Sequence, residues 1–145
     1  GTVVTWARNE EEQRSGAPTC AAGFVAIACG FFHSVGLRNN GTVATWGNNN
    51  RRNGAPTSAG FVAIACGFFH SVGLRNDGTV VSWGSNVNGE CNDSPTSAGF
   101  VAIACGDFHN VALRHDGTVV TWGRHTDGQR DDAPTGVGFV AIACG

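Results

Sequence analysis

Three amino acids are missing from this 145-residue sequence: it has no Lys, no Met and no Tyr. Charged residues make up only 14% of it, whereas about a quarter is usual. Together with a formal net charge of −2, this composition excludes the basic surface that proteins use to bind nucleic acid or anionic membranes. All nine basic residues are Arg, and a surface poor in Lys but rich in Asn, Ser and Thr would suit an extracellular protein.

Long apolar segments are also lacking. No apolar run approaches the roughly 20 residues that cross a bilayer, and no signal peptide is recognisable. Amphipathic runs of helical length are absent as well, which excludes the helical repeat families of similar period. Glycine, by contrast, occurs 22 times, about twice its usual share, and this excess favours strands joined by turns.

The sequence is repetitive. The octapeptide Gly-Phe-Val-Ala-Ile-Ala-Cys-Gly occurs four times, beginning at Gly23, Gly60, Gly99 and Gly138, so the copies are 37, 39 and 39 residues apart. This period divides the chain into a partial repeat, 1–30, and three full repeats, 31–67, 68–106 and 107–145. The partial repeat lacks residues equivalent to 31–40, so we expect a segment of a longer chain or a processed product.

Each repeat is predicted to consist of strands. In the repeat 68–106, apolar and polar residues alternate from His70 to Arg75, and the following Asp77-Gly78 pair is typical of a tight hairpin turn. A second strand, rich in β-branched and aromatic residues, follows at 79–83, and a polar linker at 85–98 leads to a third strand at 100–105. The repeat is therefore all-β.

The third strand has no polar face. In the copy at 61–66, strict alternation places Phe61 with two alanines on one face, and Val62, Ile64 and Cys66 on the other. A strand covered on both sides is apolar throughout, and small sheets that pack on copies of themselves are the blades of a β-propeller. We predict about four such blades, part of a larger ring, in which a face of small side chains receives the bulkier face of the next blade; an open β-repeat array is the alternative.

The residues also resemble a known family. The segment from Ile64 to Leu74, followed by Asp77-Gly78-Thr79-Val80 and Trp83-Gly84, resembles the regulator of chromosome condensation (RCC1-like) repeat. Two further copies match, at 27–37 and at 103–113, where Asn110 replaces the usual Ser. The resemblance implies a propeller of about seven blades, and the short repeat is similar to bacterial members, among them a propeller-shaped β-lactamase inhibitor.

Cysteine and histidine recur at equivalent positions. Side chains one repeat apart are too far apart for a disulfide, so we expect buried free thiols at Cys29, Cys66, Cys105 and Cys144, and we leave open whether Cys20 pairs with Cys91. A metal needs ligands that converge on one ion, whereas equivalent residues of neighbouring blades are spread around an axis. We therefore expect no metal and no cofactor, and the resemblance implies a structural role, with the imidazole bonded to nearby backbone, for His33, His70 and His109.

No catalytic residue is predicted. In His33-Ser34 and His70-Ser71 the neighbouring side chains point to opposite faces of a strand, so they do not form a nucleophile and its base. The chain is therefore interpreted as a non-enzyme. Four tryptophans end the second predicted strand of each repeat, and we expect them in the core: Trp6, Trp46, Trp83 and Trp122.

The linkers vary while the strands barely do. Binding residues tend to lie in such loops on a rigid scaffold, so the charged linker residues are the candidate protein contacts: Glu10, Glu11, Glu12, Arg14, Arg51, Arg52, Glu90, Asp93, Arg124, His125, Asp127 and Arg130. Asn40 and Asn92 fit the N-glycosylation pattern; Asn40 is expected at an exposed hairpin tip, and Pro95 weakens the second match.

The sequence thus predicts a non-enzymatic scaffold that binds a protein, other copies of itself, or both. The alternative is a structural subunit that assembles into a filament or extracellular coat. A third hypothesis, guanine-nucleotide exchange or protein inhibition, comes from the resemblance alone. Exposed terminal β units associate readily, so we expect an oligomer or a longer repeat chain, and no stable isolated monomer.

Overall fold

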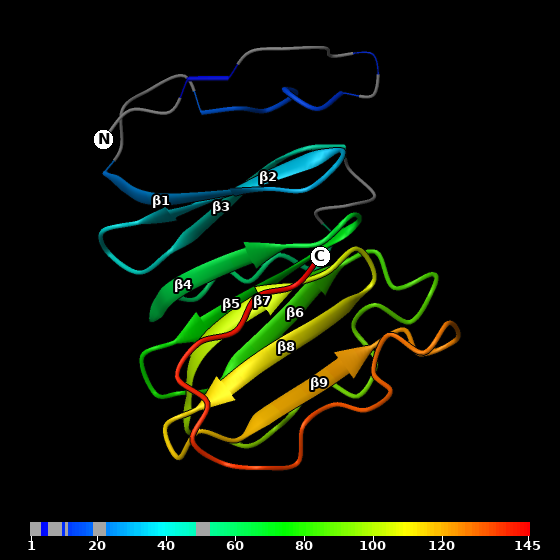
Figure 1. Cartoon of the computed structure of the whole chain (residues 1–145). Helices are drawn as coiled ribbons and strands as arrows, with labels where there is room; N and C mark the ends of the chain where they lie inside the picture. The colour runs from blue at the N-terminus through cyan, green and yellow to red at the C-terminus, as the bar shows by residue number, and fades with distance from the viewer. Residues whose placement is uncertain (1–3, 6–9, 11, 19–22, 49–52) are drawn as a thin grey trace.

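The computed structural model describes residues 4–5, 10, 12–18, 23–48 and 53–145. In these ranges the chain forms three antiparallel sheets of three strands each, which lie one on another (Figure 1). Sheet 1 holds β1 (Phe24–Cys29), β2 (His33–Arg38) and β3 (Val43–Gly47); sheet 2 holds β4 (Phe61–Cys66), β5 (His70–Arg75) and β6 (Val80–Gly84); sheet 3 holds β7 (Phe100–Cys105), β8 (His109–Arg114) and β9 (Val119–Gly123). The predicted all-β fold is confirmed.

The sheets are out of phase with the repeats defined from the sequence. The repeat 31–67 contains β2, β3 and β4, and the last of these belongs to the next sheet. A periodic sequence does not show at which residue its structural unit begins, and this is settled only by the strand pairing. Each linker therefore joins the third strand of one sheet to the first strand of the next. No helix of the length and apolarity needed to cross a membrane occurs in the described part of the chain.

The hairpins between second and third strands form as predicted. The side chain of Asp77 turns back on the chain, and its Oδ1 atom accepts hydrogen bonds from the backbone N of Thr79 at 2.9 Å and from its hydroxyl at 2.6 Å. Such local bonds favour turns over strands. Gly78 then adopts a φ of 79°, which glycine tolerates without strain.

A β-bulge changes the predicted faces of the first strands. Val62 is the extra residue of β4, because its two neighbours lie opposite Arg75 and Leu74, which are adjacent in β5. Opposite residues share a face, so Phe61 joins Ile64 and not the alanines as strict alternation predicted. The extra residue itself is 54% exposed. The equivalent extra residues of the other sheets are Val25 and Val101.

The bulge lets each phenylalanine pack over its own sheet. A Cβ atom on Gly73 would lie 2.6 Å from the ring of Phe61, so glycine lets the ring lie close to β5. Sheet 3 has Ala112 at the equivalent position. On the other side, the guanidinium carbon of Arg75 lies 5.1 Å from the ring centroid, within cation–π range. The same pairs recur as Arg38 with Phe24 and Arg114 with Phe100.

Neighbouring sheets share one apolar core. The cluster between sheets 2 and 3 contains Val72, Leu74 and Val80 from sheet 2, and Phe100, Ala112 and Trp122 from sheet 3. The small side chain of Ala63 packs at its border, as expected for a face of small residues that receives a bulkier one. Burying such side chains stabilises each sheet by about 1.5–3 kcal/mol per large residue, so no sheet is an independent unit.

The fourth copy of the strand sequence forms no strand. Residues 139–144 repeat the sequence of β4, but no strand is formed there. The Phe139 N still donates to the Gly117 O at 3.2 Å, as the Phe100 N does to the Gly78 O at 3.0 Å. The segment thus begins in the place of a next first strand.

Candidate functional site

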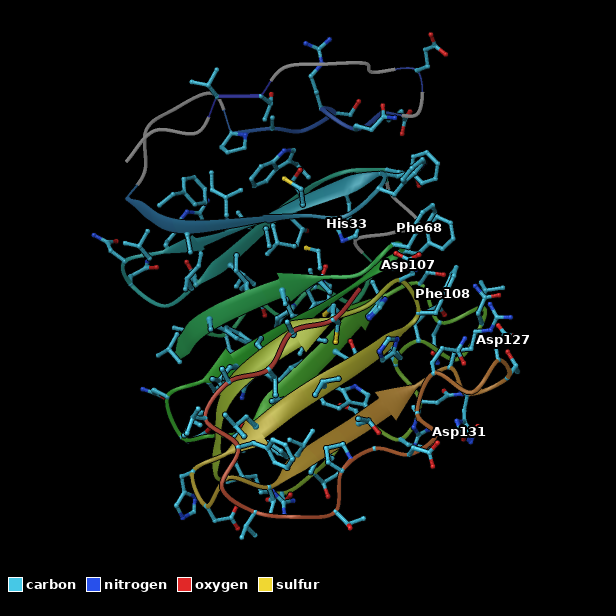
Figure 2. The ribbon with its side chains drawn as sticks, viewed as in Figure 1. His33, Phe68, Asp107, Phe108, Asp127 and Asp131 are labelled. Atoms are coloured by element: carbon cyan, nitrogen blue, oxygen red, sulfur yellow. The ribbon has the colours of Figure 1, made fainter. Side chains whose placement is uncertain are left out.

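The histidines, the paired phenylalanines and most of the charged linker residues lie at one end of the stack of sheets. This end consists of the loops between first and second strands (residues 30–32, 67–69 and 106–108) and the beginnings of the linkers (85–93 and 124–132), and we call it the loop end. Figure 2 shows Phe68, Asp107, Phe108, Asp127 and Asp131 on this side of the molecule. The opposite end carries the hairpin tips at 39–41, 76–78 and 115–117, and we call it the hairpin end.

Histidines at the loop end connect neighbouring sheets. His33 Nε2 lies 2.8 Å from the Ser71 hydroxyl, and His70 Nε2 lies 2.7 Å from Asn110 Oδ1. The Asn110 amide nitrogen donates to the Glu90 carbonyl at 2.8 Å, which leaves Oδ1 as the acceptor and makes His70 Nε2 a donor. These imidazoles bond to a side chain of the next sheet, where nearby backbone was expected. The structural role predicted for them stays a prediction, and His33 and His70 each have a specific partner.

The environment of His70 disfavours its charged form. Burial lowers its pKa from the ordinary value of 6.5, and the hydrogen bond to Asn110 and the charge of Glu90 oppose this effect. Burial also lowers the pKa of His109, and the charge of Asp107 opposes it. Within the described ranges, no group of three or more His, Cys, Asp or Glu side chains is placed to hold a metal ion.

Five phenylalanines form two rows along the loop end. In the first row Phe31 stacks on Phe68 with centroids 4.3 Å apart. In the second row Phe32 stacks on Phe69 at 5.8 Å, and Phe69 lies 6.1 Å from Phe108. The sequence reasoning missed these rows, although the signal was present as two aromatic residues before His33 and before His70.

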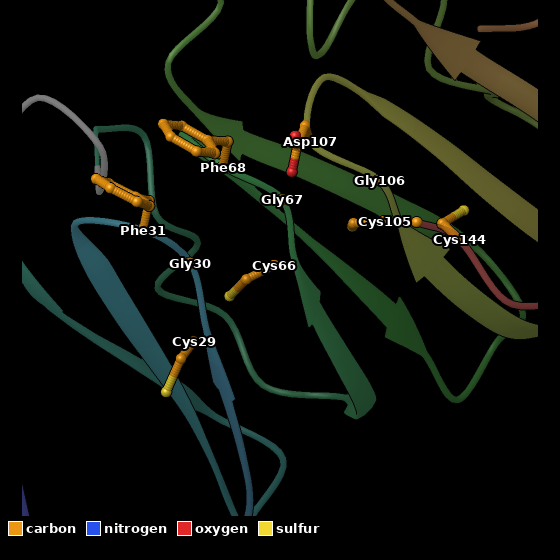
Figure 3. Close-up of a pocket in the computed structure, with 11 residues that line it drawn as sticks. Cys29, Gly30, Phe31, Cys66, Gly67, Phe68, Cys105, Gly106, Asp107 and Cys144 are labelled. Carbon is orange, nitrogen blue, oxygen red and sulfur yellow. The ribbon is translucent and has the colours of Figure 1, made fainter.

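The first row borders a cavity of about 450 Å³. Figure 3 shows its lining: Cys29, Gly30, Phe31, Cys66, Gly67, Phe68, Cys105, Gly106, Asp107 and Cys144, with Gly145 completing it. The side chains that reach it are therefore aromatic rings, thiols and one carboxylate. Glycines lie between them, and a Cβ atom on any of Gly30, Gly67 and Gly106 would meet the following histidine ring and a backbone carbonyl.

The thiols do not all behave as predicted. Cys66, Cys105 and Cys144 are partly buried, but Cys29 is exposed because no earlier sheet covers its strand in the described ranges, so the expectation of a buried thiol was wrong there. Burial raises the pKa of Cys66 to about 12 and raises that of Cys105 well above its ordinary value. Protonated thiols are poor nucleophiles and metal ligands. Cys20 lies outside the described residues, and Cys91 is free.

Most predicted contact residues in the described linkers are exposed or partly exposed. Glu10, Glu12, Arg14, Asp93, His125 and Asp127 are exposed, and Arg124 and Arg130 are partly buried. Three surface ion pairs join them: Arg124–Asp127 at 2.8 Å, His125–Asp131 at 3.3 Å and Arg130–Asp93 at 3.2 Å. Glu11, Arg51 and Arg52 lie outside the described residues.

Glu90 differs from the other linker residues because it is fully buried. Its carboxylate accepts hydrogen bonds from the backbone N and the side-chain amide of Asn88, at 2.9 and 3.1 Å. A Cβ on Gly123 of the next sheet would lie 2.8 Å from the Glu90 carbonyl, so sheet 3 closes over this residue. We therefore leave Glu90 out of the candidate contact surface.

The remaining predicted positions are located as follows. Trp46, Trp83 and Trp122 are buried, and the indole nitrogen of Trp122 donates to the Ser82 hydroxyl of the neighbouring sheet at 3.0 Å. Trp6 lies outside the described residues. Asn40 and Asn92 are both exposed, and a glycan on either of them stays a prediction.

The pattern of the regulator of chromosome condensation (RCC1) repeat matches residues 24–53, 61–90 and 100–129, more than half of the chain. The chain belongs to this repeat family. The matched segments each begin at a first strand and end in a linker, so the family repeat is one sheet with its linker. No curated protein sequence matches the chain.

Solved structures show that the three sheets are blades of an RCC1-like β-propeller. The ectodomain of the receptor kinase CR4 from Physcomitrella patens is 28% identical over 84% of this chain, with a TM-score of 0.72. The ectodomain of Arabidopsis thaliana ACR4 is 24% identical over 83%, with a TM-score of 0.67. Yeast RCC1 (Prp20) is 25% identical over 75%, with a TM-score of 0.60. This chain spans 36%, 42% and 32% of those three chains.

Proposed function

We propose that this RCC1-like array is a protein-binding module that holds its partner at the loop end. The proposal rests on one observation: linkers that differ in sequence and carry charge are anchored to blades whose strand sequences are nearly identical. Each linker is tied to the next blade by a backbone hydrogen bond: the Gly84 N donates to the Asn53 O at 2.9 Å, and the Gly123 N donates to the Asn92 O at 3.1 Å. Such anchoring lowers the entropy that a loop loses on binding.

The side chains on these linkers suit a protein surface. Arg124 lies over the Phe108 ring at 5.2 Å and pairs with Asp127. This gives an aromatic and a cationic group side by side, and both Phe and Arg are enriched in protein interfaces. Exposed ion pairs contribute only about 0–1 kcal/mol. Breaking the Arg124–Asp127 ion pair so that each side chain can pair with a charge on the partner therefore costs little stability.

A relative supports a protein ligand. Yeast RCC1 (Prp20) was solved bound to Kap60, so a propeller of this family can serve as one side of a protein complex. That partner is not carried over to this chain, because no contact residue of the relative is placed on it.

The test is quantitative affinity capture with two matched double variants. Arg124→Ser with Asp127→Ser changes the loop end, and Arg114→Ser with Asp116→Ser removes the same two charges near the hairpin end. Proteins captured by the wild-type chain should be lost with the first variant and kept with the second. Equal capture by the wild type and the loop-end variant would overturn the proposal. Thermal unfolding of both variants checks that each is folded.

A second candidate function is self-assembly, and exposed apolar side chains on the first strands of the three sheets favour it. Val25, Val62 and Val101 are 64%, 54% and 53% exposed. An exposed apolar segment with strand propensity readily pairs with another chain. Negative-stain electron microscopy separates the two functions, because closed rings support the binding module whereas continuous fibres support a structural subunit.

A further inference from the structure

Asparagine is followed by glycine at three places: Asn40-Gly41, Asn53-Gly54 and Asn88-Gly89. Glycine has no side chain to restrict or shield its backbone nitrogen, so in these pairs that nitrogen can attack the side-chain amide of the preceding asparagine. The three pairs share this chemistry, and the structure determines which of them is free to react.

The pair at the first hairpin tip is held in place. The Gly41 N donates to the Arg38 O at 2.9 Å. The Asn40 Oδ1 atom accepts hydrogen bonds from the backbone N and the hydroxyl of Thr42 at 3.1 and 2.7 Å. A Cβ atom on Gly41 would lie 2.9 Å from the Gly60 N, so the next blade packs against this tip. The nitrogen and the amide of this pair are therefore both engaged.

The pair in the linker 85–98 is held as well. The Gly89 N donates to the Asn86 O at 3.2 Å. The side-chain nitrogen and the backbone N of Asn88 donate to the Glu90 carboxylate at 3.1 and 2.9 Å, and Glu90 is fully buried. Reaction of this pair requires these hydrogen bonds to break first.

The pair in the linker between sheets 1 and 2 is free. Asn53 and Gly54 are both exposed. Within the described ranges the Asn53 side chain has no hydrogen-bond partner and the Gly54 N has no acceptor, and nothing lies within 4 Å of a Cβ atom on Gly54. One contact fixes this pair, because the Asn53 O accepts a hydrogen bond from the Gly84 N at 2.9 Å.

We propose that Asn53-Gly54 is a deamidation site whose product alters the anchor of this linker on the second blade. The Gly54 N gives up its proton and forms a bond to Cγ of Asn53, the bond between Cγ and Nδ2 breaks, and ammonia leaves with that proton. The resulting succinimide joins the Gly54 N to both carbonyl carbons of Asn53. Water then opens the ring at either carbon, and nothing is oxidised or reduced.

The carbon that water attacks decides what becomes of the anchor. Attack at Cγ gives aspartate with an unchanged backbone. Attack at the backbone carbonyl carbon gives isoaspartate, in which the chain runs through Cγ and the former backbone carbonyl is a free carboxylate. This carbonyl is the acceptor for the Gly84 N. Isoaspartate therefore adds a methylene to the backbone of the linker and a negative charge at its anchor.

The next linker supplies a matched variant. Its anchoring carbonyl belongs to Asn92, and the residue that follows is Asp93, whose φ of 58° is close to the 71° of Gly54. Aspartate tolerates this conformation because its short polar side chain bonds locally. Gly54→Asp thus replaces the reactive glycine by the residue of the next linker, in a backbone conformation that aspartate already adopts in this chain.

The test is peptide mass spectrometry of the full chain after incubation at pH 8 in 18O-labelled water, which marks only groups converted during the incubation. Trypsin places the pairs in different peptides, 39–51, 53–75 and 76–114, and fragment ions locate the modified residue. We expect Asn53 to be converted at least about tenfold faster than Asn40 and Asn88, because the glycine nitrogen of each of those pairs must first lose a hydrogen bond. Gly54→Asp should slow the conversion of Asn53.

Unfolding in urea is the control for the influence of the fold, since the three rates should then converge. Equal conversion of Asn53 and Asn40 in the folded chain would overturn the proposal. Rate differences that persist unchanged in urea would also overturn it, because the local sequence and not the fold would then set the rates.

The effect on the anchor has its own measurement. The amide proton of Gly84 should exchange with solvent faster in chains that carry isoaspartate at position 53 than in fresh protein, because its acceptor has changed. Unchanged protection of that proton would contradict the effect on the anchor.

This site does not depend on the proposed binding function. Failure of capture through Arg124 and Asp127 leaves the conversion of Asn53 unaffected. Slow conversion of Asn53 contradicts the deamidation site but leaves that capture unaffected.

Discussion

His70 and Asn110 form the buried contact that joins the second and third blades, with 2.7 Å between Nε2 and Oδ1. Both side chains are fully buried. The equivalent contact one blade earlier joins His33 to the Ser71 hydroxyl at 2.8 Å. Asn110 and Ser71 thus each bond to the histidine of the preceding blade. The longer side chain of Asn110 also donates a hydrogen bond to the Glu90 carbonyl.

This contact predicts unequal effects of two substitutions at position 110. Asn110→Ala leaves the imidazole donor unpaired, which costs about 1–3 kcal/mol of unfolding free energy. Asn110→Ser restores a hydroxyl like that of Ser71, so we expect a smaller loss. Urea unfolding of both variants measures the difference. Equal destabilisation would show that His70 gains nothing from its partner.

Stability is predicted to fall at acid pH. Burial holds the pKa of His70 below its ordinary value of 6.5 in the folded chain, and the unfolded chain therefore takes up a proton first as the pH decreases. The associated stability is present above pH 6.5 and is lost as the pH falls through the folded pKa. Unfolding free energies between pH 7.5 and pH 5 should show this slope, and it should be shallower in His70→Asn. A pH-independent stability across this range would contradict the assignment.

The sequence predicts those parts of the fold that depend on contacts within one repeat. Asp77 and Gly78 determine the hairpin through bonds to the next two residues, so their pattern is readable without a partner. The bulge at Val62 is not readable, because Val fits a regular strand and a bulge equally well. It appears only in the strand pairing, where Phe61 lies opposite Arg75 and Ala63 lies opposite Leu74.

Contacts between blades are the part that sequence reasoning misses. Glu90 is charged and lies in a variable linker, so it was predicted to be a protein contact, but the next blade covers it. The stacked rings of Phe31 and Phe68 arise in the same way, from equivalent positions brought together by blade packing. The strands and turns of one repeat can be predicted from its own sequence. Which of its side chains are exposed depends on the neighbouring blades, so exposure cannot be predicted from a single repeat.

Close packing between blades predicts a sharp difference between two Gly→Ala substitutions. A Cβ atom on Gly67 would clash with the ring of His70 and would lie 2.7 Å from the Gly106 carbonyl oxygen. Gly67→Ala should therefore destabilise the chain by about 1–3 kcal/mol through overpacking. Gly136→Ala is the control, since nothing lies within 4 Å of the position that its new methyl group would occupy, and it should be neutral. Similar thermal shifts for both variants would contradict a rigid contact between the blades.

The thiols along the cavity should react at very different rates. Burial raises the pKa of Cys66 to about 12, so at pH 8 almost no thiolate is present, and the thiolate is the species that is alkylated. Cys29 occupies the equivalent position but is exposed. We expect iodoacetamide to modify Cys29 well before Cys66 and Cys105, as measured by peptide mass spectrometry over time. If a further blade or a second copy of the chain covers β1 in solution, Cys29 becomes as slow as Cys66, and dilution then restores its reactivity only for a second copy.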